Sequence, residues 1–218
     1  MLSQQQAEVM LTLQANMNAK VNPDWVRAAY PYLRAVVVEG AEAMEHHGWK
    51  WWKKQDCDLE QLQMELVDIW HFTLSHILLE TGGDQARALQ SLVAQMVPSE
   101  HIEFDNKTIN INELDLISKL ELEIGLAAAR RISIPLFAAL LHDCKMSWTD
   151  LYCQYVGKNV LNFFRQDHGY KEGTYRKHWG GREDNEHLVE VMTSIDSEHP
   201  EFQHMLYQSL KDRYDENE

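Results

Sequence analysis

Residues 38–72 read VEGAEAMEHHGWKWWKKQDCDLEQLQMELVDIWHF, and this stretch decides the fold. It holds two carboxylate pairs with the same spacing, Glu39 with Glu42 and Glu65 with Asp68. Residues three apart on a helix lie one above the other, so each pair presents both carboxylates on one helix face. The stretch therefore predicts two acidic helix faces.

The segment between the two pairs predicts a helical hairpin. Gly48 is suited to end the first helix, and the spacing Asp58-x-x-Gln61 is typical of an N-terminal cap on the second. Two antiparallel helices joined here would bring the carboxylate pairs to the same level, facing each other. Carboxylates that converge on one spot repel one another unless they hold cations.

An all-oxygen cluster of this kind favours a hard ion, Mg²⁺ before Mn²⁺. The alternative is that these acids are solvated residues on amphipathic helices, as single ExxE pairs usually are. The flanking runs AVVV and LVDIWHF are apolar, and acids placed among core residues need a compensating partner. We therefore predict a metal site.

The composition predicts an all-α fold, a bundle of about eight helices around the central antiparallel pair. Hydrophobic residues make up 44% of the 218 residues, with only 5 Pro and 10 Gly, so we expect one continuous domain. The patterns predict helices over residues 3–19, 23–47, 58–81, 85–96, 112–131, 133–145 and 147–167, then one or two short helices and an acidic tail. Residues 98–112 are predicted to form a polar, irregular connector that has room for a short extended piece.

The charge pattern indicates a small anionic partner. The net charge of −14 disfavours a nucleic acid polymer. Residues 154–182, however, hold six basic and two acidic residues, a local charge of +4 against −18 for the rest of the chain. Three cysteines without a CxxC spacing favour a reducing compartment, and no stretch resembles a signal peptide or a membrane span. We expect a cytoplasmic protein without a membrane partner.

A second group of polar residues lies in this basic segment. Lys158, Asn162 and Arg165 are spaced i, i+4, i+7 and share a helix face, where they could bind phosphate oxygens. The glycine-rich loop that follows adds Lys171 and Lys177. An ordinary basic surface remains the alternative for these residues.

The tryptophans of the hairpin also allow two interpretations. Trp49, Trp51 and Trp52 could cover the core at a solvent-facing turn. Flat rings next to a phosphate site could equally stack on a nucleobase. The sequence leaves both interpretations open.

These motifs together resemble a known family. ExxE, WKWWK and ELVDIWHF resemble the all-α nucleoside triphosphate pyrophosphatases, and most of all the dimeric dUTPases. LQANMN with NPDW, and YVGKNVLNFFRQDHGYKEGTYRKHW followed by EDN, extend the resemblance over most of the chain. Residues 81–148 match only loosely.

The resemblance implies a homodimer that hydrolyses dUTP, with dUDP as a further substrate, to dUMP. This activity limits uracil in DNA and supplies dUMP. The resemblance further implies two or three Mg²⁺ ions per site, replaceable by Mn²⁺. Residues 81–148 would form the dimer surface or a mobile insert, and residues 168–185 the phosphate-binding loop.

Carried onto this chain, the resemblance implies the following site. The metal ligands would be Glu39, Glu42, Glu65 and Asp68, with Glu39 or Glu42 as the general base. The residues that contact the nucleotide would be Gln14, Asn18 and Trp52 near the uracil, His71 and Phe72 at the sugar, and Lys158, Asn162, Arg165, Tyr170, Lys171, Tyr175 and Lys177 around the phosphates.

Three alternatives stay open. The first keeps the chemistry but takes dCTP or a modified nucleoside triphosphate. The second is a ferritin-like di-metal protein, for which Asp68-x-x-His71 is the nearest match to the required Glu-x-x-His motif. The third is a helical interaction module without catalysis, which has no use for inward-facing acids.

Overall fold

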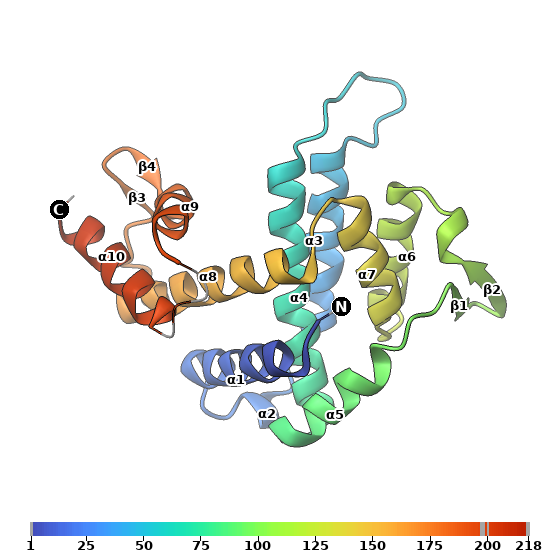
Figure 1. Cartoon of the computed structure of the whole chain (residues 1–218), viewed down its shortest axis with the longest axis horizontal. Helices are drawn as coiled ribbons and strands as arrows, with labels where there is room; N and C mark the ends of the chain where they lie inside the picture. The colour runs from blue at the N-terminus through green and yellow to red at the C-terminus, as the bar shows by residue number, and fades with distance from the viewer. Residues whose placement is uncertain (1, 197–198, 200, 217–218) are drawn as a thin grey trace.

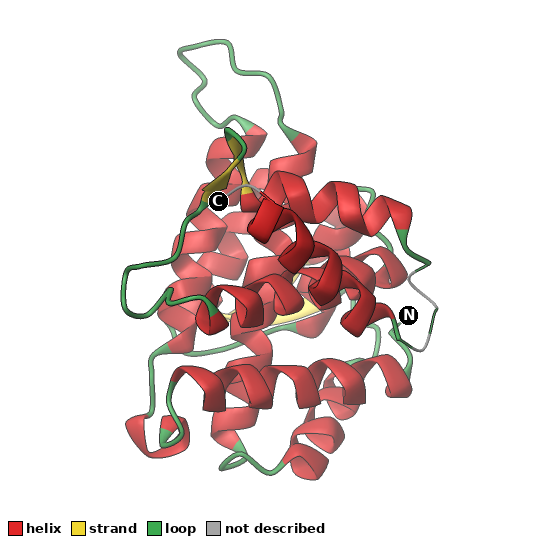
Figure 2. Ribbon diagram, turned by 90° about the vertical axis from the view of Figure 1, so that its left-hand side faces the viewer, coloured by secondary structure: helices red, strands yellow, loops and turns green. Residues whose placement is uncertain are grey.

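The computed structural model describes residues 2–196, 199 and 201–216, and within these ranges the chain forms ten α-helices and two two-stranded hairpins. The all-α class is thus confirmed (Figures 1 and 2). The helices are α1 Gln4–Val21, α2 Trp25–Ala28, α3 Tyr32–His47, α4 Leu59–Glu80, α5 Gln85–Gln95, α6 Leu116–Ala128, α7 Ile134–Asp143, α8 Trp148–Asp167, α9 Asp184–Ser194 and α10 Phe202–Glu216. The strands are β1 His101–Phe104, β2 Lys107–Asn110, β3 His178–Trp179 and β4 Arg182–Glu183.

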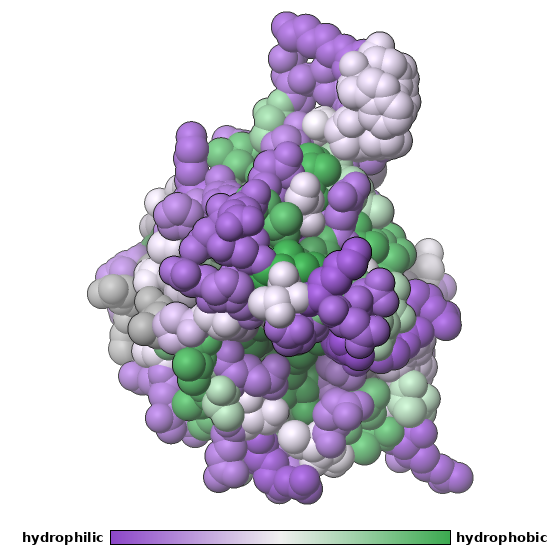
Figure 3. All heavy atoms as spheres, turned by 90° about the vertical axis from the view of Figure 1, so that its right-hand side faces the viewer, coloured by the Kyte–Doolittle hydropathy of each residue, from purple (hydrophilic) through white to green (hydrophobic). Residues whose placement is uncertain are grey.

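The predicted hairpin of α3 and α4 stands at the centre of the molecule (Figure 1). Gly48 follows α3 with a φ of 86°, a conformation that glycine adopts without strain. The Asp58 side chain accepts a hydrogen bond from the Gln61 backbone N–H and so caps α4. The loop between them projects beyond the helical body, as Figures 2 and 3 also show. Gly48 and Asp58 therefore act as the sequence predicted.

The prediction of one helix over residues 23–47 is wrong. The helix ends after one turn as α2, because Ala29 adopts a left-handed conformation with a φ of 48°. Pro31 then precedes α3; its ring removes a backbone donor and restricts Tyr30 to non-helical conformations. This break places Tyr30 and Tyr32 beside a pocket described below.

Other expected boundaries also change. Residues 98–112 contain the hairpin of β1 and β2, whose turn residues Asp105 and Asn106 have φ values of 52° and 58°. Asp115, and not Asn112, caps α6, because its side chain accepts from the Ser118 backbone N–H. The expected acidic tail is helical as far as the structure describes it, since α10 continues to Glu216.

The core forms where α4 packs against its neighbours. Trp70 is fully buried; its ring stacks on Phe137 of α7 at a centroid distance of 4.9 Å and meets Trp148 of α8 edge-on at 5.3 Å. The helices α1 and α8 pack against each other and against α4, so α4 carries functional residues towards both. Among the described residues no helix combines the length and hydropathy needed to span a membrane.

Candidate active site

Three of the four predicted metal ligands converge. Glu39 and Glu42 of α3 and Glu65 of α4 each place a carboxylate oxygen within 4.8 Å of the others. Glu65 is buried, Glu39 is half-buried and Glu42 is exposed, so the carboxylate cluster opens to solvent on one side. Carboxylate oxygens are the donors that hard divalent cations prefer, and the residues present fit such an ion.

The fourth predicted ligand, Asp68, has a different partner. Its Oδ2 lies 3.1 Å from Nζ of Lys158, a buried lysine of α8. Asp68 nevertheless lies close enough for its charge to act on Glu39 and Glu65. The sequence predicted both residues as functional but did not predict that they pair with each other.

Burial and the neighbouring negative charges raise the pKa values of two carboxylates in the cluster. Burial, with the charges of Asp68, Glu65 and Glu42, raises the pKa of Glu39 to about 8. Burial and the charges of Asp68 and Glu42 raise the pKa of Glu65 to about 7. A hydrogen bond between Glu39 and Glu65 favours the proton on Glu39. The cluster therefore holds protons at neutral pH when nothing neutralises its charge.

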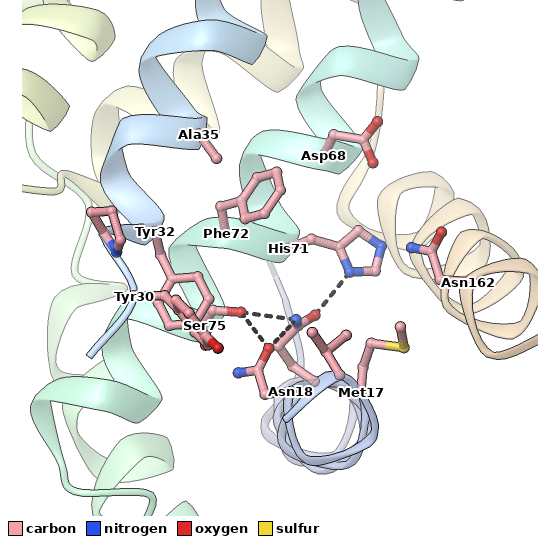
Figure 4. A pocket seen from close by; sticks show the side chains of 13 residues that line it. Met17, Asn18, Tyr30, Tyr32, Ala35, Asp68, His71, Phe72, Ser75 and Asn162 are labelled. Carbon is pink, nitrogen blue, oxygen red and sulfur yellow. Dashed lines mark hydrogen bonds between the residues drawn. The ribbon is translucent and has the colours of Figure 1, made fainter. Parts of the chain in front are cut away.

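A pocket of about 400 Å³ lies beside the carboxylate cluster, between α1, α3, α4 and α8 (Figure 4). Asp68 lies in its wall and so connects the pocket to the cluster. The lining residues are Gln14, Met17, Asn18, Val21, Tyr30, Pro31, Tyr32, Ala35, Asp68, His71, Phe72, Ser75 and Asn162. Five of the predicted nucleotide contacts belong to this set, namely Gln14, Asn18, His71, Phe72 and Asn162.

The pocket floor is a network of buried hydrogen bonds. Gln14 Nε2 donates to Ser75 Oγ at 2.8 Å and to Asn18 Oδ1 at 3.1 Å. Ser75 Oγ also donates to Asn18 Oδ1 at 3.1 Å. Gln14 Oε1 accepts from His71 Nδ1 and from the Tyr155 hydroxyl, each at 2.8 Å. Two polar atoms of this network, Asn18 Nδ2 and His71 Nε2, are buried without a partner.

His71 is neutral in this environment. Complete burial, and after it the charge of Lys158, lowers its pKa to about 3. Because Nδ1 donates to Gln14, Nε2 carries a lone pair and can accept a hydrogen bond. Asn18 thus keeps an amide nitrogen, and His71 an acceptor nitrogen, that are buried among the residues around the pocket without a hydrogen-bond partner.

The predicted phosphate-binding cations all have partners of their own. The Arg165 guanidinium forms two hydrogen bonds to Asp184, at 2.8 and 2.9 Å, and the Tyr175 hydroxyl donates to the same carboxylate at 2.9 Å. Although burial opposes ionisation of Asp184, the hydrogen bonds from Arg165 keep its pKa below the ordinary value.

The loop after α8 carries the remaining predicted contacts. Lys177 lies 3.2 Å from the Glu183 carboxylate, and Lys171 donates to the backbone carbonyl of Val21 at 3.2 Å. Tyr170 is exposed. Lys158, Arg165, Lys171 and Lys177 must therefore exchange or share a partner to bind phosphate.

The tryptophan loop stands apart from the pocket. The rings of Trp51 and Trp52 are 87% and 59% exposed and pack edge-on against each other. Trp49 donates its indole N–H to Glu45 at 2.6 Å. Trp52, the predicted uracil contact, does not line the pocket in this structure.

The sequence analysis did not predict several of the residues that the structure places at the site. Ser75 lies one turn after His71, so the i, i+4 spacing could have pointed to it. Tyr30 and Tyr32 reach the pocket only because the helix is interrupted between α2 and α3, and the sequence analysis predicted one continuous helix there. His46 was also missed; its Nε2 lies 3.5 Å from Glu65 Oε1 at the carboxylate cluster.

An all-α fold with a carboxylate cluster beside a pocket that has a polar floor is typical of helical hydrolases acting on phosphoric anhydride bonds. The family model described as dUTPase matches residues 6–170, so the chain belongs to the all-α dimeric dUTPase family and is a dUTP diphosphatase. Enzymes of this family generally depend on a divalent metal ion. A comparison with curated proteins gives no match.

Proposed function

We propose that the protein hydrolyses dUTP to dUMP and pyrophosphate with Mg²⁺, and that dUDP is a further substrate. The observation that carries this proposal is the place of Asp68, which lines the pocket and acts electrostatically on Glu39 and Glu65. A nucleoside held in the pocket would have its phosphates next to the carboxylate cluster. Hydrolysis of dUTP would limit the incorporation of uracil into DNA and would supply dUMP.

The proposed ligands of two or three Mg²⁺ ions are Glu39, Glu42, Glu65 and Asp68, with Mn²⁺ as a substitute. When bound, Mg²⁺ would stabilise the negative charge that develops on the leaving pyrophosphate. Either Glu39 or Glu42 would accept the proton of the attacking water. Lys158, which is paired with Asp68, would then be free to share its charge with a phosphate.

The pocket suggests how the nucleotide would lie. Figure 4 shows the Asn18 amide turned towards Tyr30 and Tyr32, and the His71 ring turned towards Asp68 and Asn162. A base at the tyrosine end and a sugar beside His71 would direct the phosphates to the carboxylate cluster. The proposed nucleotide contacts are Gln14, Asn18, Trp52, His71, Phe72, Lys158, Asn162, Arg165, Tyr170, Lys171, Tyr175 and Lys177.

A nucleotide panel with pyrophosphate detection tests the activity. Wild type with Mg²⁺ is expected to release pyrophosphate from dUTP, and Glu65→Gln is expected to lower kcat by at least about 10²-fold. Glu60→Gln is the matched control, because Glu60 lies on the same helix but is exposed in its first turn. A wild type that hydrolyses no deoxynucleoside triphosphate contradicts the proposal.

The dCTP or modified-nucleotide alternative differs only in the base, and the same panel decides it. The ferritin-like alternative gains no support, because His71 Nδ1 is committed to Gln14 and the chain belongs to another family. The alternative of an interaction module without catalysis conflicts with the finding that the chain is a dUTP diphosphatase.

The homodimer and the cytoplasmic location also stay proposals. A groove lined by Met96, Val97, Pro98, Ala138 and Trp148 supports a dimer surface within residues 81–148, since Val97 is 65% exposed there. Light scattering on wild type and on Val97→Glu tests it. A monomeric wild type at micromolar concentration contradicts the dimer.

A further inference from the structure

Helix α10 packs against the end of α8 that leads into the loop of residues 168–181 (Figure 1). The contact is made by the buried ring of Tyr214, near the end of α10. This ring lies edge-on to Phe164 of α8 at a centroid distance of 5.3 Å and to Trp179 of β3 at 5.1 Å. Edge-on ring pairs are favourable beyond the area that they bury. The end of α10 is therefore part of the same aromatic core as the loop.

Tyr214 also holds two consecutive residues of the loop. Its ring lies parallel to the ring of Tyr175, with an interplanar angle of 1° and a centroid distance of 5.7 Å, which is an offset stack. The Arg176 guanidinium lies over the Tyr214 ring, 4.2 Å from its centroid, and donates to the Tyr214 carbonyl at 3.1 Å. The direction of the Tyr175 side chain is thus set by a residue of α10.

Tyr175 connects Tyr214 to Arg165 through one carboxylate. The Tyr175 hydroxyl donates to Asp184 Oδ2 at 2.9 Å, and the same oxygen accepts from Arg165 Nε at 2.8 Å. The Asp184 side chain is fully buried, so water does not compete for these bonds. Its second oxygen accepts from Arg165 Nη2 at 2.9 Å, and the paired bonds fix the plane of the guanidinium.

Arg165 keeps donors for a ligand in this arrangement. Its bonds to Asp184 and Asn162 use three of the five N–H groups that a guanidinium has, so two N–H groups remain. The plane that Asp184 fixes decides where these two groups point. A guanidinium that turns away from this plane loses the paired geometry with which arginine binds phosphate oxygens.

We propose that Tyr214 is a positioning residue for nucleotide binding: its ring, through Tyr175 and Asp184, fixes the direction in which Arg165 presents its remaining N–H groups to the phosphates. The inference rests on the proposed function for the phosphates at Arg165, and it deepens it by giving α10 a part in the site. Helix α10 follows residues 6–170, which the family model matches. The contribution of Tyr214 is specific to ligands that carry phosphates.

A purely structural role of Tyr214 predicts a different result. If Tyr214 served the stability of α10 alone, its replacement would weaken the binding of all ligands or of none. The positioning role predicts a loss for a nucleoside triphosphate and no loss for the nucleoside, because the nucleoside has no phosphate for Arg165 to hold.

The decisive variant is Tyr214→Leu, because leucine is apolar but has no ring to stack on Tyr175. In calorimetry with Mg²⁺, this variant should bind a non-hydrolysable dUTP analogue about tenfold more weakly than wild type and should bind deoxyuridine equally well. Tyr214→Phe keeps the ring and should bind the analogue as wild type does. It loses a hydroxyl that lies 3.4 Å from the Arg176 backbone nitrogen.

Leu206→Ala is the matched control. Leu206 is fully buried on α10, about two turns before Tyr214, so its truncation should lower the melting temperature without changing the preference for the analogue over deoxyuridine. Tyr175→Phe removes the bond to Asp184 and gives a second, milder test. In the Tyr175→Phe background, Tyr214→Leu should cost little further affinity for the analogue, because both changes break the same connection.

The outcomes separate this inference from the proposed function. Unchanged affinity for the analogue in Tyr214→Leu, equal losses for the analogue and deoxyuridine, or additive losses in the double variant overturn the inference, while hydrolysis of dUTP by wild type keeps the proposed function. A wild type without hydrolysis contradicts the proposed function. A loss in Tyr214→Leu that is confined to the analogue supports the inference even then.

Discussion

Lys158 Nζ lies 3.1 Å from Asp68 Oδ2, with only 9% of the lysine side chain exposed. A buried ammonium group needs a negative partner, so this pair makes Asp68 different from the other three acids of the site. Glu39, Glu42 and Glu65 have no lysine or arginine at ion-pair distance among the described residues, and the charges of the acidic site raise the pKa values of Glu39 and Glu65. The sequence treats the four carboxylates alike, whereas the structure predicts opposite effects when they are neutralised.

The first prediction follows from this difference. Without metal at pH 8, where Glu65 is ionised, Glu65→Gln should raise the free energy of unfolding, because it removes a charge from a repelling cluster. Asp68→Asn should lower it by about 1 to 3 kcal/mol, because it leaves Lys158 buried without its carboxylate. Urea unfolding of both variants with EDTA measures the two changes. Equal changes of the same sign would contradict this distinction.

The second prediction concerns pH. The pKa values of Glu39 and Glu65 are raised to about 8 and about 7, above the 4.5 that is ordinary for a glutamate, so the folded protein binds protons more tightly than the unfolded chain. The stability from this source is complete below pH 4.5 and is lost as the pH rises through 7 to 8. Urea unfolding from pH 5 to pH 9 should show this fall without metal.

Mg²⁺ should reverse the trend, because it binds the deprotonated carboxylates of the folded state alone. A separate contribution comes from Glu123, whose complete burial raises its pKa to about 8. Glu123→Gln should weaken the pH dependence equally with and without Mg²⁺, whereas Glu39→Gln should remove the part that Mg²⁺ changes. If Mg²⁺ does not change the melting temperature of wild type at pH 8, the carboxylate cluster is not an ion site.

The third prediction tests the pair of Arg165 and Asp184. The Asp184 side chain is fully buried and holds Arg165 through two hydrogen bonds and Tyr175 through a third. Asp184→Asn should lower the free energy of unfolding by about 3 kcal/mol, because the guanidinium remains buried without its counter-charge. Tyr175→Phe should cost about 1 kcal/mol.

The control for this pair is Lys177→Met, which removes an exposed partner of Glu183 and should change stability little. If Asp184→Asn is as mild as Lys177→Met, Arg165 is not held by Asp184 in solution and is free for phosphate.

Local signals in the sequence predicted what depends on local chemistry. Gly48 ends α3 and Asp58 caps α4 as the sequence predicts, and Ser147 with Asp150 forms a capping box at the start of α8. Each of these signals acts within one turn of the chain. They were sufficient to predict the central hairpin and the convergence of Glu39, Glu42 and Glu65.

Ion pairs between residues that lie far apart in the sequence could not be predicted from such local signals. Nothing in the sequence around Asp68 indicates Lys158, which lies 90 positions away, or assigns Asp184 to Arg165. The sequence analysis did not predict that the helix is interrupted at Ala29, because an alanine in the left-handed conformation has no sequence signature. Pro31 was the one local signal against a continuous helix. The tyrosine end of the pocket depends on that break, so it could not be predicted.

The last prediction concerns closure of the loop of residues 168–181. Its backbone is folded by hydrogen bonds to Arg165 and Gly169, and Lys171 reaches the Val21 carbonyl, but Glu172, Gly173 and Thr174 are exposed. Because Lys171 and Lys177 hold weak partners at the surface, phosphates next to the carboxylate cluster should draw them over the site. Trypsin should therefore cut after Lys171 or Lys177 in the free protein, and a non-hydrolysable dUTP analogue with Mg²⁺ should slow this cleavage at least about tenfold. Cleavage after the exposed Lys54 serves as the internal control for protease activity. Equal rates at residues 171–177 with and without the analogue would mean that the loop is a static surface and that its lysines do not close over the nucleotide.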